Sequence, residues 1–376
     1  MHYFGFPSKD STLYEVSSSM NTSLDEILEV RKDMNADGTV INTSRILIKF
    51  DLTYISESVA SGLITSGSNT KFYLNLYDAN STDLNISQTL YGYPVSQSWS
   101  NGSGKHDSNP VISDGVGWKW KDDSTTRTQW NAVSQSGGTW YSGSGYEASQ
   151  SFTHEPADLR MDVTDIAWKW LHSTVPNEGF MLKRSGSIGN TDSNLEEGNT
   201  TRYGHFSFFS SNTHTIYPPK LEVVWDDSSW STGSLAPLTG SALEDTVLYF
   251  KGLREEYKQN SKVRFRVVGR ERYPAKTFAT SSANIVTKYL PSGSQVIEHG
   301  TYYSVKDSVT EDVIVPFGTG SIVSCDTTGN YFNVWMNGFQ PERYYKFEIR
   351  VATGSRSSAT QIVNYYDDDW TFKVTR

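Results

Sequence analysis

Short segments in which apolar and polar residues alternate recur along the chain, and they constrain its fold more than any other feature. In residues 44–52, SRILIKFDL, Ile46 and Ile48 lie on one side of an extended chain and Arg45 on the other, with Leu47 as an apolar exception on the polar side. The same pattern recurs in KFYLNLYDA (71–79), HFSFFSS (205–211) and LEVVWDD (221–227). Several half-buried strands separated by turn residues predict a β-sandwich or jelly roll.

A polar stretch of small residues divides these strands into two groups. Residues 226–242, DDSSWSTGSLAPLTGSA, have the composition of a linker, and strands resume beyond them in SKVRFRVVG and YYKFEIRVA. We therefore predict an all-β protein with a jelly-roll-like sandwich at 1–226, a linker at 227–242 and a second, smaller sandwich at 243–376. Chain length is compatible with two domains that each bury a core.

One segment departs from the β pattern. Residues 161–183, MDVTDIAWKWLHSTVPNEGFMLK, place Ile166 and Trp170 at helical spacing, and Pro176 and Gly179 then end the helix before another strand. The apolar face is complete and the polar face is ordinary. We therefore expect one short helix that closes an end of the first sandwich.

Composition excludes several classes of protein. The chain has 376 residues, a net charge of −9 and one cysteine, Cys325, which rules out an internal disulfide and a cysteine-rich metal site. The acidic balance argues against nonspecific nucleic-acid binding, and no apolar run is long enough to cross a membrane as a helix. The amino-terminal residues also lack the pattern of a signal peptide.

A loop-rich excursion at 96–150 concentrates tryptophans among Gly and Ser. Its five tryptophans are Trp99, Trp118, Trp120, Trp130 and Trp140. So many aromatic residues indicate that the segment is ordered. We expect its rings to lie on an edge or an end of the sandwich. Trp99 and Trp118 are expected to be core anchors. Trp130 and Trp140 are the candidates for exposed platforms on which a glycan could stack, with burial as the alternative.

Two further patterns are candidate binding sites. Asp33, Asn35 and Asp37, followed by Gly38, resemble the first half of a calcium loop, but Ser44 stands where a bidentate Glu is needed, so a plain turn is the favoured interpretation.

The second pattern is a basic run in an acidic chain, and its members are Lys262, Arg264, Arg266, Arg270 and Arg272. These cations could face an acidic neighbouring subunit, or they could form a solvated strand face that pairs with carboxylates of its own chain.

The ordered set of segments in the first domain resembles a known family. TSRILIKFDL, KFYLNLYDA, SQSWSNGSG, DGVGWKWKD, MDVTDIAWKWL, VPNEGFMLK and YPPKLEVVW resemble the DNRLRE-type domain, a jelly-roll-like sandwich of surface proteins and of tailed-bacteriophage virion proteins. In the second domain, Phe339, Pro341 and Tyr345 have the spacing of the tyrosine corner in fibronectin type III and Ig-like domains.

Proteins with this type of domain have varied functions, as virion structural components or as carbohydrate-binding modules, so the resemblance implies no catalytic residues. An extracellular type of sandwich without a signal peptide or disulfides leads us to expect a virion component, such as a capsid decoration, neck or tail accessory protein, that assembles in many copies with other virion proteins. The alternative is an extracellular carbohydrate-binding or adhesion module that binds a host glycan through the tryptophan loop. A polysaccharide-active enzyme is the remote alternative, because no H-E-x-x-H or G-x-S-x-G motif is present. We expect no cofactor other than the possible calcium ion, and neither nucleic acid nor membrane as a partner.

Overall fold

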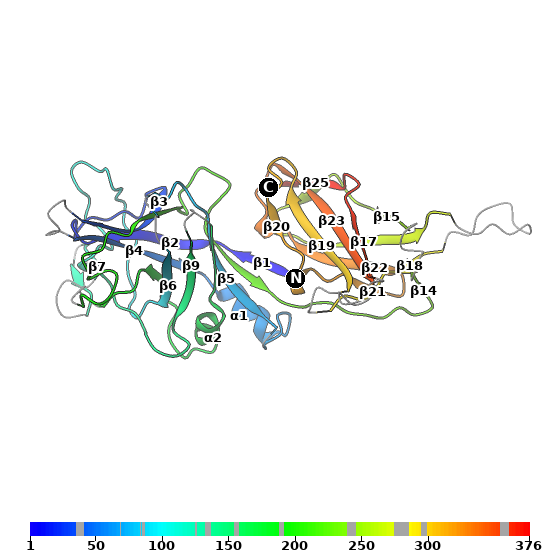
Figure 1. The fold of residues 1–376 in the computed structure, drawn as a ribbon, viewed down its shortest axis with the longest axis horizontal. Coiled ribbons are helices and arrows are strands. Elements are labelled where there is room, and N and C mark those ends of the chain that lie inside the picture. The colour runs from blue at the N-terminus through cyan, green and yellow to red at the C-terminus, as the bar shows by residue number, and fades with distance from the viewer. Residues whose placement is uncertain are drawn as a thin grey trace, which may run out of the picture. The chain divides into compact units, whose positions relative to one another are not determined.

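The computed structural model describes the chain except residues 35–40, 68, 83, 85–86, 125, 132–136, 154–157, 188–191, 239–245, 274–285, 295–298 and 354–360. The chain divides into two compact units. The first unit comprises Gly5–Ala60 and Lys71–Glu222, and the second comprises Met1–Phe4, Ser61–Thr70 and Val223–Arg376. Both are built from curled β-sheets, so the protein is all-β and sandwich-like, as predicted (Figure 1).

The larger sheet of the first unit has seven strands. Its order is β12 (Gly204–Phe209), β3 (Ile27–Met34), β4 (Ile41–Phe50), β11 (Phe180–Lys183), β6 (Gln88–Pro94) and β9 (Ala148–Phe152), with β2 (Pro7–Tyr14) also on β4. A four-stranded sheet has the order β1 (His2–Gly5), β13 (Lys220–Val224), β5 (Lys71–Leu76) and β10 (Leu159–Asp162). The short strands β7 (Trp120–Asp122) and β8 (Thr128–Gln129) pair with each other.

The alternation of apolar and polar residues along the strands explains which side chains form the inner core of this unit. Ile46 and Ile48 of β4 are fully buried, as the sequence pattern predicts. Gly92 of β6 lies close to Met161 of β10, so a Cβ atom at position 92 would come within 2.9 Å of the Met161 sulfur. The two sheets therefore pack closely at this point, and a larger residue at position 92 would have to displace the Met161 side chain.

The prediction of a half-buried strand is wrong for β4, because other residues of the first unit also cover the side that carries Arg45. Arg45 and Leu47 are both 0% exposed. Leu47 belongs to a second apolar cluster on the outer face of the large sheet, and its buried members are Leu13, Leu47, Val95, Trp99, Val116, Trp118, Trp130 and Met181. The tryptophan-rich excursion thus lies over a face of the sheet, where we expected it over an edge or end.

Two helices accompany the strands of the first unit. Helix α2 (Thr164–Leu171) confirms the predicted helix, and its Ile166, Ala167 and Trp170 are buried. Helix α1 (Thr53–Ala60) was not predicted. Its first turn is fixed by Asp51, whose Oδ1 accepts a hydrogen bond from the Thr53 amide at 2.9 Å. Neither of these described helices has the length and hydropathy of a membrane span.

The second unit contains two further six-stranded sheets. The first has the order β14 (Ala236–Pro237), β18 (Lys288–Tyr289), β17 (Lys262–Glu271), β22 (Gly329–Trp335) and β21 (Ser324–Asp326), with β15 (Thr246–Lys251) on β17. The second has the order β16 (Glu256–Lys258), β25 (Thr371–Thr375), β23 (Arg343–Thr353), β19 (Gly300–Asp307) and β20 (Val313–Val315), with β24 (Ile362–Tyr366) on β23. Two 3₁₀ turns are η3 (Thr319–Ser321) and η4 (Met336–Gly338).

Aromatic rings from both sheets form the core of the second unit. Phe265 of β17 and Phe332 of β22 contact Phe347 of β23, with ring centroids 4.7 and 5.4 Å apart. The predicted tyrosine corner is present: the Tyr345 hydroxyl accepts a hydrogen bond from the Gln340 amide at 2.7 Å and donates to the Gln340 carbonyl at 3.1 Å. This contact fixes the entry of the chain into β23.

The segment that we predicted as a linker, 227–242, contributes to the second unit where it is described. The Ser231 amide donates to the Cys325 carbonyl, and the Cys325 amide donates to the Ser229 carbonyl at 3.0 Å. Strand β14 then pairs in parallel with β18. Cys325 is buried, and burial raises the pKa of its thiol to about 11, which suits an unreactive side chain.

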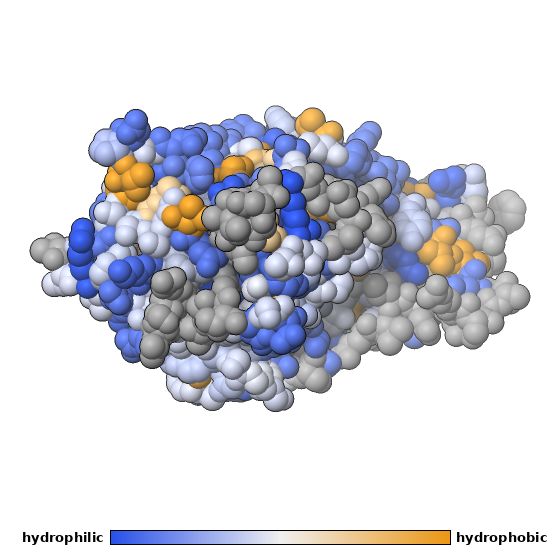
Figure 2. Space-filling model, turned by 60° about the vertical axis from the view of Figure 1, so that its left-hand side comes forward, coloured by the Kyte–Doolittle hydropathy of each residue, from blue (hydrophilic) through white to orange (hydrophobic). Residues whose placement is uncertain are grey.

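The coloured residues on the face seen in Figure 2 are largely hydrophilic. Figure 2 shows hydrophobic residues on the visible face as small, separate groups among hydrophilic ones. Such scattered residues are normal for a folded chain and do not define an apolar docking site.

Candidate functional site

A polar pocket of about 550 Å³ lies in the first unit. Strand β2 contributes Tyr14, β3 contributes Glu29 and Arg31, and β12 contributes His205. Residues Glu29 and Arg31 are two apart on one strand, so their side chains lie on the same face of the sheet. His106, from the tryptophan-rich excursion, lines another part of the pocket.

Glu29 is the central acceptor of this pocket. His205 Nε2 lies 3.0 Å from Glu29 Oε1, and the Tyr14 hydroxyl donates a hydrogen bond to Glu29 Oε2. Arg31 adds a more distant charge at 3.9 Å. Burial by itself raises the pKa of Glu29, but the hydrogen bonds from His205 and Tyr14 and the charge of Arg31 outweigh burial and lower it to about 2. Glu29 is therefore a carboxylate near neutral pH and cannot donate a proton there.

His106 forms a second polar group in the pocket. Its ring lies edge-on to Tyr14 with centroids 5.0 Å apart, and its backbone amide donates to both Asp25 oxygens at 3.1 Å. Burial raises the pKa of Asp25. Carboxylates, imidazoles and a tyrosine ring around one hollow can hydrogen-bond a polar ligand and contact its apolar face.

The sequence pattern gave no direct signal for this pocket. Glu29 and His205 are 176 positions apart, and neither belongs to a recognisable motif. The alternation in HFSFF predicts only that His205 lies on the polar face of its strand. Only the pairing of β12 with β3 brings His205 next to Glu29.

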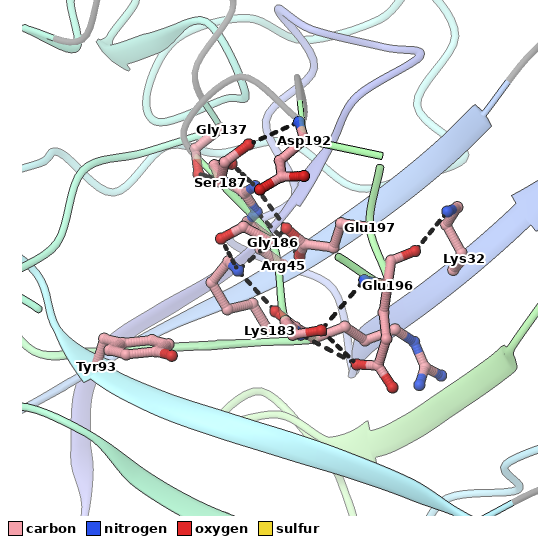
Figure 3. A network of polar contacts seen from close by, with 12 residues as sticks. Lys32, Arg45, Tyr93, Gly137, Lys183, Gly186, Ser187, Asp192, Glu196 and Glu197 are labelled. Carbon is pink, nitrogen blue, oxygen red and sulfur yellow. Dashed lines mark hydrogen bonds and ion pairs between the residues drawn. The ribbon is translucent and has the colours of Figure 1, made fainter. Parts of the chain in front are cut away.

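The first unit also contains a buried network of charges (Figure 3). Arg45 Nη2 lies 2.7 Å from Glu197 Oε2, and Lys183 Nζ lies 3.1 Å from the same oxygen. All three side chains are at most 1% exposed. A single buried carboxylate therefore balances two buried cations, a geometry that strongly penalises removal of the carboxylate.

Backbone carbonyl groups complete the network. Lys32 Nζ donates to the carbonyl oxygens of Glu196 and Asn199 at 2.6 and 2.7 Å, and Lys183 Nζ donates to that of Gly186 at 3.0 Å. Figure 3 shows these side chains converging on the segment that carries Glu196 and Glu197. The network therefore fastens this segment onto strands β3, β4 and β11.

The pKa values of this network follow from its burial. Burial lowers the pKa of Lys183 and of Lys32 to about 8, although Glu197 opposes both shifts. Burial raises the pKa of Glu197, but the charges of Arg45 and Lys183 outweigh it and lower the pKa. Glu197 is thus held as a carboxylate by its partners. Because every group faces another group of the chain, we assign the network a structural role.

The structure places the predicted tryptophans in two environments. Trp99, Trp118 and Trp130 are buried at 3%, 1% and 3% exposure. Trp130 Nε1 donates to the Gly117 carbonyl at 3.1 Å, so this ring belongs to the outer core and has no free face for a sugar. Trp140 is partly buried, and Arg45 and Lys183 lie 5.1 and 4.9 Å from its ring centre. The burial of Trp99 and Trp118 confirms that they are core anchors.

The basic run on β17 separates into residues with and without internal partners. Arg266 forms two hydrogen bonds with Asp326, at 2.9 and 2.7 Å, which confirms the solvated-face interpretation for this residue. Arg270 donates to the neighbouring Glu271 carbonyl, while Arg272 is exposed. Lys262 and Arg264 are both exposed.

A basic groove of about 710 Å³ in the second unit includes these two exposed cations. Its charged lining residues are Arg254, Glu256, Lys258, Lys262 and Arg264. Within the described part of the chain none of the four cations forms an ion pair. The Arg264 guanidinium lies 4.3 Å from the Tyr331 ring centre and donates to Asn333 Oδ1 at 3.3 Å. The groove therefore carries more positive than negative charge and can accept an anionic partner.

The calcium hypothesis concerns a segment that is mostly outside the described residues. Asp33 lies in β3, where it pairs with Asn42 of β4, and its carboxylate is 3.9 Å from Arg31. Asn35 and Asp37 lie outside the described residues. Among the residues that are described, no group of three or more His, Cys, Asp or Glu side chains is arranged to hold a metal ion.

Comparisons with known proteins found little that resembles this chain. No family model matches it, and no curated protein matches it. A solved structure of a DUF4785 family protein from Legionella pneumophila aligns with 98% of the chain at 9% sequence identity and a TM-score of 0.17. The chain spans 65% of the length of that protein. A similarity this low supports no conclusion about fold or function.

Proposed function

We propose that this chain is a non-catalytic structural component of a tailed-bacteriophage virion and acts through protein–protein interfaces. The observation that carries the proposal is the basic groove. Arg254, Lys258 and Lys262 are exposed without an ion pair to a described residue, whereas Arg266, on the same strand as Lys262, is paired with Asp326. In a chain of net charge −9, such a local surplus suits docking against an acidic protein surface.

The scaffold is compatible with this role. Each unit has its own buried core, and the buried charge network fixes a long connecting segment onto the first unit. The order of motifs that resembles the DNRLRE-type domain gives the proposal its place in a tailed phage. A decoration, neck or tail accessory protein would use such rigid sandwiches to present its surfaces to neighbouring subunits.

The experiment is mass spectrometry of density-purified particles from the phage whose genome encodes the chain. We expect peptides from both units at a fixed ratio to the major capsid protein after high-salt washing. A non-structural protein from the same infected cells serves as the contamination control. Absence of the chain from particles, or its loss in parallel with that control, contradicts the proposal.

The polar pocket supports a second candidate function, the binding of a host-surface glycan. Glu29, Asp25 and His106 surround a hollow large enough for a sugar ring. This site replaces Trp130, whose ring is buried. Glycan-array binding that disappears in His106→Ala, but persists in the exposed control His172→Ala, would favour this candidate; arrays without any specific signal would exclude it.

A further inference from the structure

We propose that copies of this chain associate head to tail, with an acidic turn of one copy seated in the basic groove of the next. The acidic turn consists of Asp367, Asp368 and Asp369 in the second unit. The inference rests on the proposed structural function, which it deepens by naming the partner as a second copy of the chain. It concerns only surfaces within the second unit.

The groove offers separate cationic groups on adjoining elements. Arg254 precedes β16, Lys258 ends β16, and Lys262 begins β17. Glu256 is the opposing charge in the lining, so the cations outnumber the carboxylates. The Tyr257 hydroxyl accepts a hydrogen bond from the Arg254 amide at 2.9 Å, which fixes the chain at the rim. A short acidic segment would neutralise the surplus charge.

The acidic turn is exposed but firmly anchored. Asp367, Asp368 and Asp369 are all exposed between β24 and β25. The next residue, Trp370, is 8% exposed, and its carbonyl accepts a hydrogen bond from the Phe347 amide at 3.1 Å. The side chains are thus presented by a fixed backbone, which reduces the entropy lost on binding.

Only part of the negative charge of the turn is neutralised within the chain. Lys346 Nζ lies 3.4 Å from Asp367, but it also lies 2.8 Å from Glu311. Asp368 and Asp369 form no ion pair with any residue in the described ranges. The turn therefore retains negative charge that a second copy can compensate.

Strand β25 separates the two surfaces. The acidic turn immediately precedes Thr371, the first residue of β25, whereas Thr375, its last residue, lines the basic groove. Four residue steps of β-strand span about 13 Å, so the turn cannot enter the groove of its own copy while β25 is intact. Because the surfaces differ, pairing between copies is heterologous and generates either a ring or an open array.

The test is sedimentation velocity of the full chain at low ionic strength with paired charge reversals. The groove variant is Arg254→Glu with Lys258→Glu, and the turn variant is Asp367→Lys with Asp368→Lys. Wild type is expected to self-associate with rising concentration and to dissociate as salt is added. We expect each variant alone to associate at least about tenfold more weakly, because like charges then face each other.

An equimolar mixture of the two variants is the decisive sample. In the mixture, the unaltered turn of one variant meets the unaltered groove of the other, and the two reversed surfaces also match, so association is expected to return. The control Lys119→Glu with Lys251→Glu makes the same charge change outside the groove and should associate like wild type. Circular dichroism and thermal melting establish that every variant is folded.

Several outcomes would overturn the inference. These are a monomeric wild type, variants that associate like wild type, a control that weakens as much as the groove variant, or a mixture that remains dissociated. If the groove variant loses self-association and the turn variant does not, the groove binds another acidic segment. A chain that is present in purified particles but does not self-associate would refute this inference and leave the structural function standing.

Discussion

At the scale of single residues, Glu197 has the most demanding environment in the first unit. Its carboxylate is fully buried between Arg45 and Lys183, and the nearby Lys32 is satisfied by the backbone carbonyl groups of Glu196 and Asn199. Replacing Glu197 leaves two buried cations without their counter-charge. The energetic effect should therefore greatly exceed that of an ordinary surface ion pair.

The variant Glu197→Gln tests this difference. We expect the unfolding free energy of the first unit to fall by about 3 to 5 kcal/mol, as for other buried pairs that lose one partner. The matched control is Glu178→Gln, which removes a partly exposed pair with Lys49 and should cost about 0 to 1 kcal/mol. Urea unfolding followed by tryptophan fluorescence measures both values, and equal losses would refute the structural role of the network.

Glu29 should contribute to the acid sensitivity of the first unit. Its pKa is about 2 in the folded chain, against 4.5 as the reference value, so the unfolded chain binds this proton at higher pH. The stabilisation is complete above pH 4.5 and is lost as the pH falls towards 2, by about 2 to 3 kcal/mol. In Glu29→Gln this part of the pH dependence should disappear, whereas the exposed control Glu57→Gln should retain it; unfolding curves at several pH values decide.

At the scale of elements, the tryptophan-rich excursion acts as a cover for a sheet. Trp118 and Trp130 fill the outer core, and Gly137 lies so close to the Trp118 ring that a Cβ atom would meet it at 2.7 Å. The Gly137 carbonyl also accepts a hydrogen bond from Arg45 Nη1 at 2.8 Å. One loop thus covers the apolar core and the charged network together.

Both the excursion and helix α2 should respond to mutation as structural elements. Trp130→Ala and Trp170→Ala are each expected to destabilise the first unit by about 3 to 5 kcal/mol, because each removes a buried indole. Trp170 packs on Phe180 with ring centroids 4.5 Å apart. Stability and partner binding are measured on the same samples; a Trp170→Ala chain of normal stability that loses its partner would show that the helix binds directly.

The sequence predicted the elements whose pattern lies within one short stretch of the chain. Strand β4, helix α2 and the Tyr345 corner follow from residues that are neighbours in the chain. The coverage of Arg45 and Leu47 could not be predicted, because the excursion that covers them lies some fifty to ninety positions further on. For the same reason the pairs of Glu29 with His205 and of Arg45 with Glu197 left no signal in the sequence. Long-range pairing decides which polar residues are buried.

At the scale of the whole molecule, two all-β units provide distinct surfaces on one chain. The first unit has the polar pocket, and the second has the basic groove and the acidic turn. Predicted strands at 44–52 and 261–269 located the sheets, but no sequence pattern distinguishes Arg266, which is paired, from Arg264, which faces the groove. That distinction depends on Asp326 across the sheet.

Cryo-electron microscopy of purified particles can show whether the chain is a structural component of the virion. We expect ordered density into which both β units fit at a repeated position, with the basic groove of the second unit against an acidic neighbouring surface. Particles lacking the chain should lose that density and regain it on addition of purified protein. Particles that contain no such density, or that are unchanged when the chain is absent, would contradict the claim.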